Sequence, residues 1–176
     1  MTYFSELCKA MNWLGEQQDT LFIGQGVVDG GTFMSATFAE VPLEKRTEFP
    51  VTEQLQMGTS IGLAIGGYFP ISVYPRHNFL LLGMSELVNL LNNVPEITKN
   101  EYFPKMIIRT AVGTTRPIFP GIQHAGNFTK AFKELLTTVE VIELKEPEEI
   151  FPVYQYAYHK NGATLISEFG DYYNEK

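Results

Sequence analysis

Four side chains have the type and the position that chemistry at a binding site needs. Glu53 opens a predicted helix, where the helix dipole stabilises a carboxylate and where a carboxyl group can also accept or hold a proton. Arg76 and His77 follow the next predicted strand, and His124 lies in a loop rich in proline and glycine. An imidazole can stabilise or protonate an oxyanion near neutral pH, and a guanidinium can pair with a carboxylate or phosphate. Taken singly, Glu53 is also explained as a helix-start charge and Arg76 as a surface charge.

A helix predicted over residues 53–68 must position this carboxylate. Thr52 stands at its N-cap, and Gly58, Gly62 and Gly66 recur every fourth residue and therefore share one face. Each glycine costs a helix interior roughly 1 kcal/mol against alanine, and a close approach of another element would offset that cost. The residues between the glycines are almost wholly apolar. The pattern predicts a buried helix whose glycine face packs on a partner helix or on a copy of itself.

The elements around this helix alternate between strand and helix patterns. Short apolar runs predict strands, and an apolar period of about 3.6 residues predicts helices. Strands are predicted over residues 21–24, 48–51, 71–74, 106–112, 139–142 and 163–169, and helices over 3–18, 53–68, 80–91, 128–136 and 146–158. This alternation is typical of an α/β fold, so we expect a three-layer domain with a mainly parallel sheet flanked by helices.

Composition restricts the class of protein. The chain has 176 residues, 44% of them apolar and 19% charged, as expected for one globular domain. A formal net charge of −7 gives no support for binding nucleic acid. The single cysteine, Cys8, excludes an intramolecular disulfide, and no apolar run approaches the roughly 20 residues of a membrane span. We therefore expect a cytoplasmic protein without a signal peptide, and three scattered histidines predict no metal site.

Several motifs stand in the order and spacing of one known family. They are Thr52-Glu53-Gln54, Pro70, the turn His77-Asn78-Phe79, Lys105 to Gly113, and Gly121 to Ala125. With them, the sequence from Leu21 to Tyr173 resembles the pyrimidine-binding domain of thiamine-diphosphate enzymes. It is most similar to the beta subunits of 2-oxoacid dehydrogenases and to the central region of transketolases. The resemblance implies the thiamine-diphosphate-binding fold of the pyrimidine-binding type.

The resemblance also implies roles for the candidate residues. Glu53 matches the glutamate that hydrogen-bonds a pyrimidine ring nitrogen and so activates the cofactor, thiamine diphosphate. Phe79 matches the aromatic residue on the pyrimidine face, or else it is a core aromatic, and His77 stands at a cofactor-binding position that is often aromatic. His124 matches the catalytic histidine that faces the reacting centre and the substrate. Arg76 would meet an anionic substrate group, and no residue is expected to bind metal.

The diphosphate half of such a site has no counterpart in the sequence. The family's G-D-G motif is followed after about thirty residues by an asparagine pair, and together these hold the divalent metal. The nearest residues, Val28-Asp29-Gly30 and Asn92-Asn93, lack the first glycine and stand twice as far apart. Residues 1–176 are therefore predicted to be a single pyrimidine-binding domain of a split enzyme, without a diphosphate-binding domain or the transketolase C-terminal domain. An alpha-like partner subunit would hold Mg2+, in a complex built on a homodimer or an α2β2 heterotetramer.

The predicted activity is that of a two-component thiamine-diphosphate-dependent enzyme. It would cleave or transfer a carbon–carbon bond of a 2-oxoacid or ketose, as a transferase or an oxidoreductase. Ketol transfer, decarboxylation and dehydrogenation share one activated cofactor, so the motifs predict only this class. Two other readings stay open: a non-catalytic module that keeps the fold to bind or regulate a partner, and an unrelated flavodoxin-like domain with a different cofactor.

Overall fold

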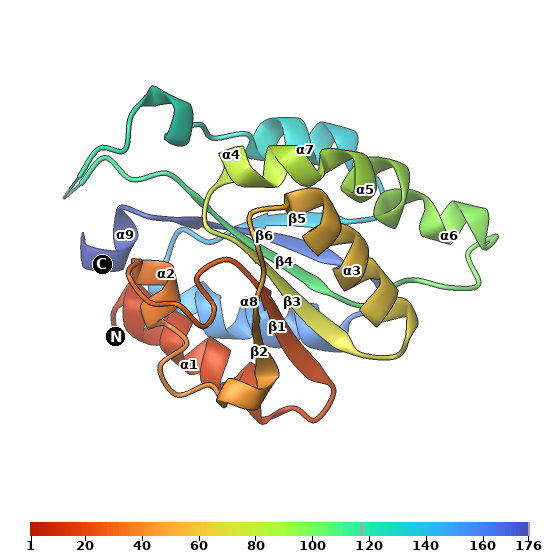
Figure 1. The fold of residues 1–176 in the computed structure, drawn as a ribbon, viewed down its shortest axis with the longest axis horizontal. Helices are drawn as coiled ribbons and strands as arrows, with labels where there is room; N and C mark the ends of the chain where they lie inside the picture. The colour runs from red at the N-terminus through yellow and green to blue at the C-terminus, as the bar shows by residue number, and fades with distance from the viewer. Residues whose placement is uncertain (117, 176) are drawn as a thin grey trace.

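The computed structural model describes residues 1–116 and 118–175 (Figure 1). A six-stranded sheet runs through the middle of the molecule in the order β2-β1-β3-β4-β6-β5, and every pair of neighbouring strands is parallel. The strands are β1 (Thr20–Gly24), β2 (Arg46–Glu48), β3 (Phe69–Tyr74), β4 (Ile107–Val112), β5 (Glu140–Glu143) and β6 (Thr164–Phe169). The predicted α/β fold with a parallel sheet is confirmed.

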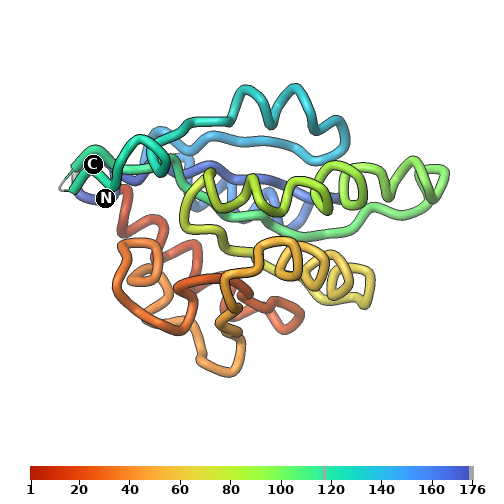
Figure 2. The backbone as a smooth tube through the Cα atoms, turned by 45° about the horizontal axis from the view of Figure 1, so that its top comes forward, coloured from red at the N-terminus to blue at the C-terminus, as the bar shows by residue number. Residues whose placement is uncertain are grey.

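Helices cover both faces of the sheet. Helices α1 (Tyr3–Glu16) and α8 (Pro147–His159) pack on one face, and α3 (Glu53–Ile65), α5 (Met84–Asn89) and α7 (Thr129–Leu135) pack on the other (Figures 1 and 2). The short α-helices are α2 (Phe33–Ala36), α4 (His77–Leu80), α6 (Val94–Ile97) and α9 (Tyr172–Glu175), and the 3-10 turns are η1 (Leu43–Lys45), η2 (Leu81–Gly83), η3 (Leu91–Asn93) and η4 (Ile122–His124). No helix in the described part of the chain is both long and apolar enough to cross a membrane.

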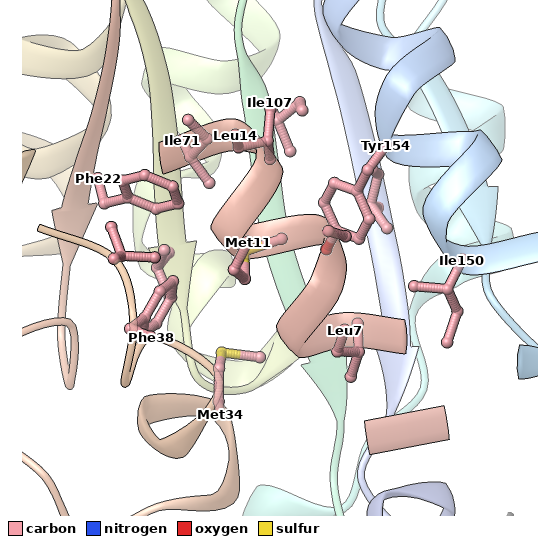
Figure 3. Packing of buried hydrophobic residues seen from close by; sticks show 14 of the residues in the cluster. Leu7, Met11, Leu14, Phe22, Met34, Phe38, Ile71, Ile107, Ile150 and Tyr154 are labelled. Carbon is pink, nitrogen blue, oxygen red and sulfur yellow. The ribbon is translucent and has the colours of Figure 1, made fainter. Parts of the chain in front are cut away.

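The two faces divide the core into two clusters. Successive residues of a strand point to opposite faces, so Ile107 of β4 joins the cluster under α1 and α8, whereas Ile108 joins the cluster under α3 and α7. Leu7, Met11 and Leu14 of α1 fill the first cluster at helical spacing (Figure 3). Burial on both faces explains why the central strands read as nearly continuous apolar runs.

A buried ion pair interrupts the first cluster. Arg109 of β4 donates from Nε to Oε1 of Glu168 at 2.7 Å and from Nη2 to Oε2 at 3.0 Å, and both side chains are fully buried. The hydroxyls of Tyr154 and Tyr173 also donate to Glu168, and Nη1 of Arg109 donates to Thr37. Burial alone would lower the pKa of Arg109, but the Glu168 carboxylate holds that pKa well above its usual range. Losing one partner of such a pair leaves a buried charge uncompensated.

Two predicted elements differ clearly from the structure, whereas the others differ only by one to three residues at their ends. Strand β2 lies over Arg46–Glu48 and not over 48–51, because Pro50 has no N–H to continue the ladder beyond Phe49. The helix predicted over 80–91 is divided between the last residue of α4, η2, α5 and the first residue of η3. Gly83 lies at the break, where a Cβ would stand 3.2 Å from the carbonyl oxygen of Glu53, so the chain passes closely over the start of α3.

The glycine face of α3 has no neighbour within the described chain. A Cβ at Gly58 or at Gly62 would meet no atom within 4 Å, and Leu55 and Ile65 are 57% and 56% exposed. The opposite face of α3 packs on the sheet through Met57 and other buried residues. The expectation of a wholly buried helix is therefore wrong for the chain by itself: one face is buried and the glycine face is open. Thr52 precedes α3 but makes no side-chain capping bond.

Candidate functional site

Glu53 is a buried carboxyl with one oxygen unpaired. It is the first residue of α3, at the end of the helix that lies over the carboxyl edge of the sheet, and it is only 3% exposed. Gln25, directly after β1, donates from Nε2 to Oε1 of Glu53 at 3.1 Å. Oε2 accepts no hydrogen bond from any described residue. This oxygen is not among the fully buried polar atoms that lack a partner, so a donor from outside the chain can reach it.

The first turn of α3 is tied to β3 below it. Gln56, one turn after Glu53, is fully buried and donates from Nε2 to the carbonyl of Val73 at 2.9 Å and to Oγ of Ser72 at 3.2 Å. The hydroxyl of Tyr74 lies 3.5 Å from the backbone carbonyl of Glu53. Burial, with the Glu53 charge in support, raises the pKa of Tyr74, which therefore stays a neutral donor. These contacts fix where the carboxyl group stands.

A glycine is required where β1 passes into the site. Gly24 has φ of +153°, and a Cβ there would lie 2.2 Å from the carbonyl oxygen of Val73. Any side chain would push β1 away from β3 at this point. The close approach lets Gln25 leave the sheet at the level of Glu53, to which it donates.

The glycine-rich loop after β1 is folded around a carboxylate of the chain itself. Glu48, at the end of β2, accepts hydrogen bonds from the backbone N–H groups of residues 26–29 at 2.6 to 3.3 Å. Burial alone would raise the pKa of Glu48, but these four amide donors hold it below its ordinary value. Converging amides form an anion-binding concavity, and Glu48 already fills this one.

Arg76, Phe79 and His124 come together a short distance along the same edge. Nη1 of Arg76 donates to the backbone carbonyl of His124 at 3.4 Å, and the rings of Phe79 and His124 lie 5.4 Å apart. Gly113, at the end of β4, makes this possible, because a Cβ there would be 2.1 Å from the same carbonyl oxygen. Nδ1 of His124 is buried and has no hydrogen-bond partner among the described residues. The structure thus groups three of the predicted site residues.

His77 is not grouped with them. It is fully buried, and its Nδ1 accepts the backbone N–H of Phe128 at 3.0 Å. Because an amide N–H can only donate, Nε2 carries the ring proton and donates to Oγ of Ser167 at 3.0 Å. Burial lowers the pKa of His77 to about 4, so the ring is neutral near pH 7. As a correction to the predicted cofactor contact, the structure makes His77 a strut between α7 and β6, with neither nitrogen open to a ligand.

Turn η2 connects the surroundings of Glu53 to the group of Arg76, Phe79 and His124, and a cavity lies next to this second group. After Phe79 the chain enters η2, which packs on the first turn of α3 beside Glu53. A cavity of about 710 Å³ lies on the other side of Phe79, between the ends of β3, β4 and β6 and the loop before α2. Glu53 does not line it. Among the described residues, no three His, Cys, Asp or Glu side chains are placed to hold a metal ion.

The layered parallel sheet, covered by helices on both faces, defines a three-layer α/β domain. A solved structure described as a split gene transketolase, in an inactive beta4 tetramer, matches it with a TM-score of 0.72 and 16% sequence identity. The match covers 97% of this chain and 52% of that one, so the chain spans about half the length of that protein. At this identity the likeness shows the fold, and it confirms the predicted resemblance. No family model matches the sequence, and no curated protein sequence matches it significantly.

Sequence reasoning missed the residues that orient Glu53. Gln25 lies 28 positions before the carboxyl group it contacts, and no local pattern connects the two. Gln56 and Tyr74 had a visible signal, because both are polar groups within segments predicted to be buried. A buried polar side chain needs a partner, and the end of the neighbouring strand was the nearest one available.

Proposed function

We propose that this chain is the pyrimidine-binding subunit of a two-component thiamine-diphosphate-dependent enzyme that acts on a 2-oxoacid or ketose. The observation that carries the proposal is the buried Glu53, oriented by Gln25 and left with one free oxygen at the carboxyl edge of the sheet. The fold likeness to a split gene transketolase supports it. The diphosphate and Mg2+ would be held by a separate alpha-like subunit.

The residues present fit the pyrimidine half of the cofactor. A pyrimidine needs a hydrogen-bonding partner for its ring nitrogen and a flat apolar wall for its face. Oε2 of Glu53 is unpaired, and Phe79 is a half-buried aromatic ring on the segment that leads into η2. A diphosphate-bound metal needs oxygen ligands, and the proposal assigns these to the partner subunit.

Each residue then has a definable task. When bound, thiamine diphosphate supplies the carbon nucleophile that cleaves or transfers the carbon–carbon bond. Glu53 would hold the pyrimidine through a hydrogen bond to a ring nitrogen, and Gln25 keeps the carboxyl group in place. His124 would exchange a proton with a substrate oxygen, and Arg76 would pair with an anionic substrate group. Phe79 keeps water from the ring.

The open face of α3 is the proposed contact with a second subunit. Gly58 and Gly62 leave the helix backbone accessible, and exposed Leu55, Ile65 and Leu82 lie on α3 and η2, which pack together. Exposed apolar residues gathered on one side of a domain are typical of protein interfaces. A homodimer, or an α2β2 heterotetramer with the alpha-like subunit, would bury this face.

The test is the Glu53→Gln variant, which keeps the side-chain size but removes the titrating acid. The isolated chain should bind thiamine diphosphate weakly. With the partner and Mg2+, the wild-type complex should promote exchange of the thiazolium proton, and the variant should exchange about 100- to 10,000-fold more slowly. Cofactor affinity should change much less. Glu96→Gln, an exposed first-turn glutamate of α6, is the matched control and should leave exchange unchanged.

Two results would contradict the proposal. If the Glu53→Gln complex binds cofactor and exchanges at the wild-type rate, Glu53 does not activate it. If no partner subunit confers cofactor binding, the chain is a non-catalytic module of the same fold.

A further inference from the structure

The cavity beside Phe79 has the size of a small-molecule site. Its volume of about 710 Å³ lies within the range of roughly 300 to 1,000 Å³ that is usual for ligand pockets. Its wall is built by four segments that are distant in sequence: the loop and helix over 31–36, residues 75–79 after β3, the end of β4 with residues 113, 114, 118 and 120, and the start of α9. All of them meet at the carboxyl edge of the sheet, where parallel α/β folds place their ligands.

Apolar groups make up most of the described wall. Phe33 and Met34 come from α2, Val112 from β4 and Phe79 from α4. Tyr173 donates its hydroxyl to the buried Glu168, so its ring is the part available to the cavity. Such a wall favours a ligand with an apolar body over a polyhydroxylated one, whose hydroxyls would lose their hydrogen bonds to water.

Arg76 is the only charged side chain among the described residues that line the cavity. Its guanidinium has five N–H donors, and its one hydrogen bond here is the long contact of 3.4 Å to the carbonyl of His124. No described carboxylate lies within ion-pairing distance of it. Burial lowers the pKa of Arg76, a desolvation that a bound anion would offset.

The backbone amides near the cavity favour a carboxylate over a phosphate. Phosphate sites combine several donors, commonly the amides of a loop. Here the amides of residues 26–29 already bind Glu48, and those of Thr115 and Arg116 already bind Asp171. Arg76 is then the one cation in the described wall of the cavity, and its planar fork matches the two oxygens of a carboxylate.

We propose that this cavity binds a small organic carboxylate with an apolar body, whose carboxylate pairs with Arg76 and whose body lies against Phe33, Met34 and Phe79. The binding itself requires neither cofactor nor partner. Only its consequence rests on the proposed function: if that function holds, the substrate is a 2-oxoacid with an apolar side chain and not a phosphorylated ketose.

The test uses the full chain alone, with 3-phenylpropionate as the probe. Binding is followed by calorimetry and by NMR of 13C-labelled methionine methyl groups, with the Met34 signal assigned from Met34→Leu. We expect 3-phenylpropionate to bind and to shift the Met34 signal but not that of Met57, which lies under the opposite face of the sheet. The uncharged 3-phenylpropan-1-ol, propionate and inorganic phosphate should each bind at least about 10-fold more weakly, because each lacks the apolar body or the carboxylate.

Three variants complete the design. Arg76→Gln should weaken 3-phenylpropionate by about 10- to 100-fold, as expected for a lost charge-assisted hydrogen bond, and should bring the acid and the alcohol to similar affinities. Ala36→Phe, on the exposed helix α2 at the cavity wall, should weaken both. Lys130→Gln, an exposed cation of α7 outside the cavity, should change neither.

The outcomes separate this inference from the proposed function. Equal binding of acid and alcohol to the wild type, unchanged acid binding by Arg76→Gln, or tighter binding of phosphate would each overturn it. None of these measurements involves thiamine diphosphate. A positive result therefore stands even if no partner activates a cofactor, and a negative one leaves the Glu53 test intact.

Discussion

The buried histidine His77 should make the stability of this protein depend on pH. Its pKa is about 4 in the folded chain, whereas its ordinary value is 6.5. Well above pH 6.5 the ring is neutral in both states and contributes no pH dependence. As the pH falls from 6.5 towards 4, the unfolded chain takes up a proton that the folded chain does not, so the free energy of unfolding decreases.

The size of the effect follows from the two pKa values. At about 1.4 kcal/mol for each pKa unit, the difference between 6.5 and about 4 lowers the free energy of unfolding by about 3 to 4 kcal/mol at most. That is a large part of the roughly 5 to 15 kcal/mol that stabilise a typical domain. Carboxylates also titrate towards the lower end of this range, so the His77 contribution is obtained by comparison with a variant.

The assay is urea unfolding at several pH values between 4.5 and 7.5. His77→Asn cannot titrate, but its Oδ1 can still accept the Phe128 N–H, so the variant should be less stable at pH 7 and should have a flatter profile below pH 6.5. His159→Asn removes an exposed histidine and should keep the wild-type slope. Parallel profiles for wild type and His77→Asn would refute the assignment of a buried, neutral strut, and would return His77 to the candidates for ligand contact.

Two further predictions concern assembly and stability. Gly62→Leu should disrupt association with a copy or a partner subunit by steric overlap on the open face of α3. The fold should persist, because no described atom lies within 4 Å of a Cβ at that position. Light scattering measures the association and circular dichroism the fold, and an unchanged complex would count against this interface. Glu168→Gln should lower the free energy of unfolding by about 3 to 5 kcal/mol, since it leaves the charge of Arg109 buried and uncompensated. Glu143→Gln, which removes a partly exposed ion pair with Lys133, should lower the free energy of unfolding by less than about 1 kcal/mol. If urea unfolding shows a similar loss of unfolding free energy for both variants, the buried pair stabilises the fold no more than the exposed pair does.

The sheet was predictable because its strands are apolar on both faces. The run 106–112 leaves β4 no solvent side, and alternation with helical segments then implies parallel strands. The single long helix predicted over 80–91 failed for a tertiary reason. Its apolar period continues through Gly83, but the chain must pass within contact of the Glu53 carbonyl there, and that packing breaks the helix.

Residues of the candidate site could be predicted only where they belong to a sequence motif. Arg76, Phe79 and His124 do meet, although His124 reaches the other two through a loop whose path depends on Gly113. The sequence did not show which way the His77 side chain points, because that depends on its position around helix α4. His77 lies three residues before Leu80 and shares that residue's buried face.

The pairing of Arg109 with Glu168 could be predicted from the sequence only in part. Both charges stand inside apolar strand patterns, and a buried charge requires a partner of opposite sign. That rule alone makes the pair the simplest solution once β4 and β6 are neighbours. The adjacency of those strands, however, is a property of the order β2-β1-β3-β4-β6-β5, which no local pattern encodes.

The polar groups at the carboxyl edge of the sheet favour some ligands over others. Carboxylates of the chain, Glu48 and Asp171, occupy the loop amides that would otherwise attract a phosphate. Among the described residues of the site, one oxygen of Glu53 accepts no hydrogen bond, one nitrogen of His124 has no partner, and the guanidinium of Arg76 makes one long hydrogen bond. These can recognise a ring nitrogen, a reacting oxygen and a carboxylate, and a diphosphate would need donors from another chain. The division of labour in the proposed two-subunit enzyme thus has a reason in hydrogen bonding that is independent of any motif.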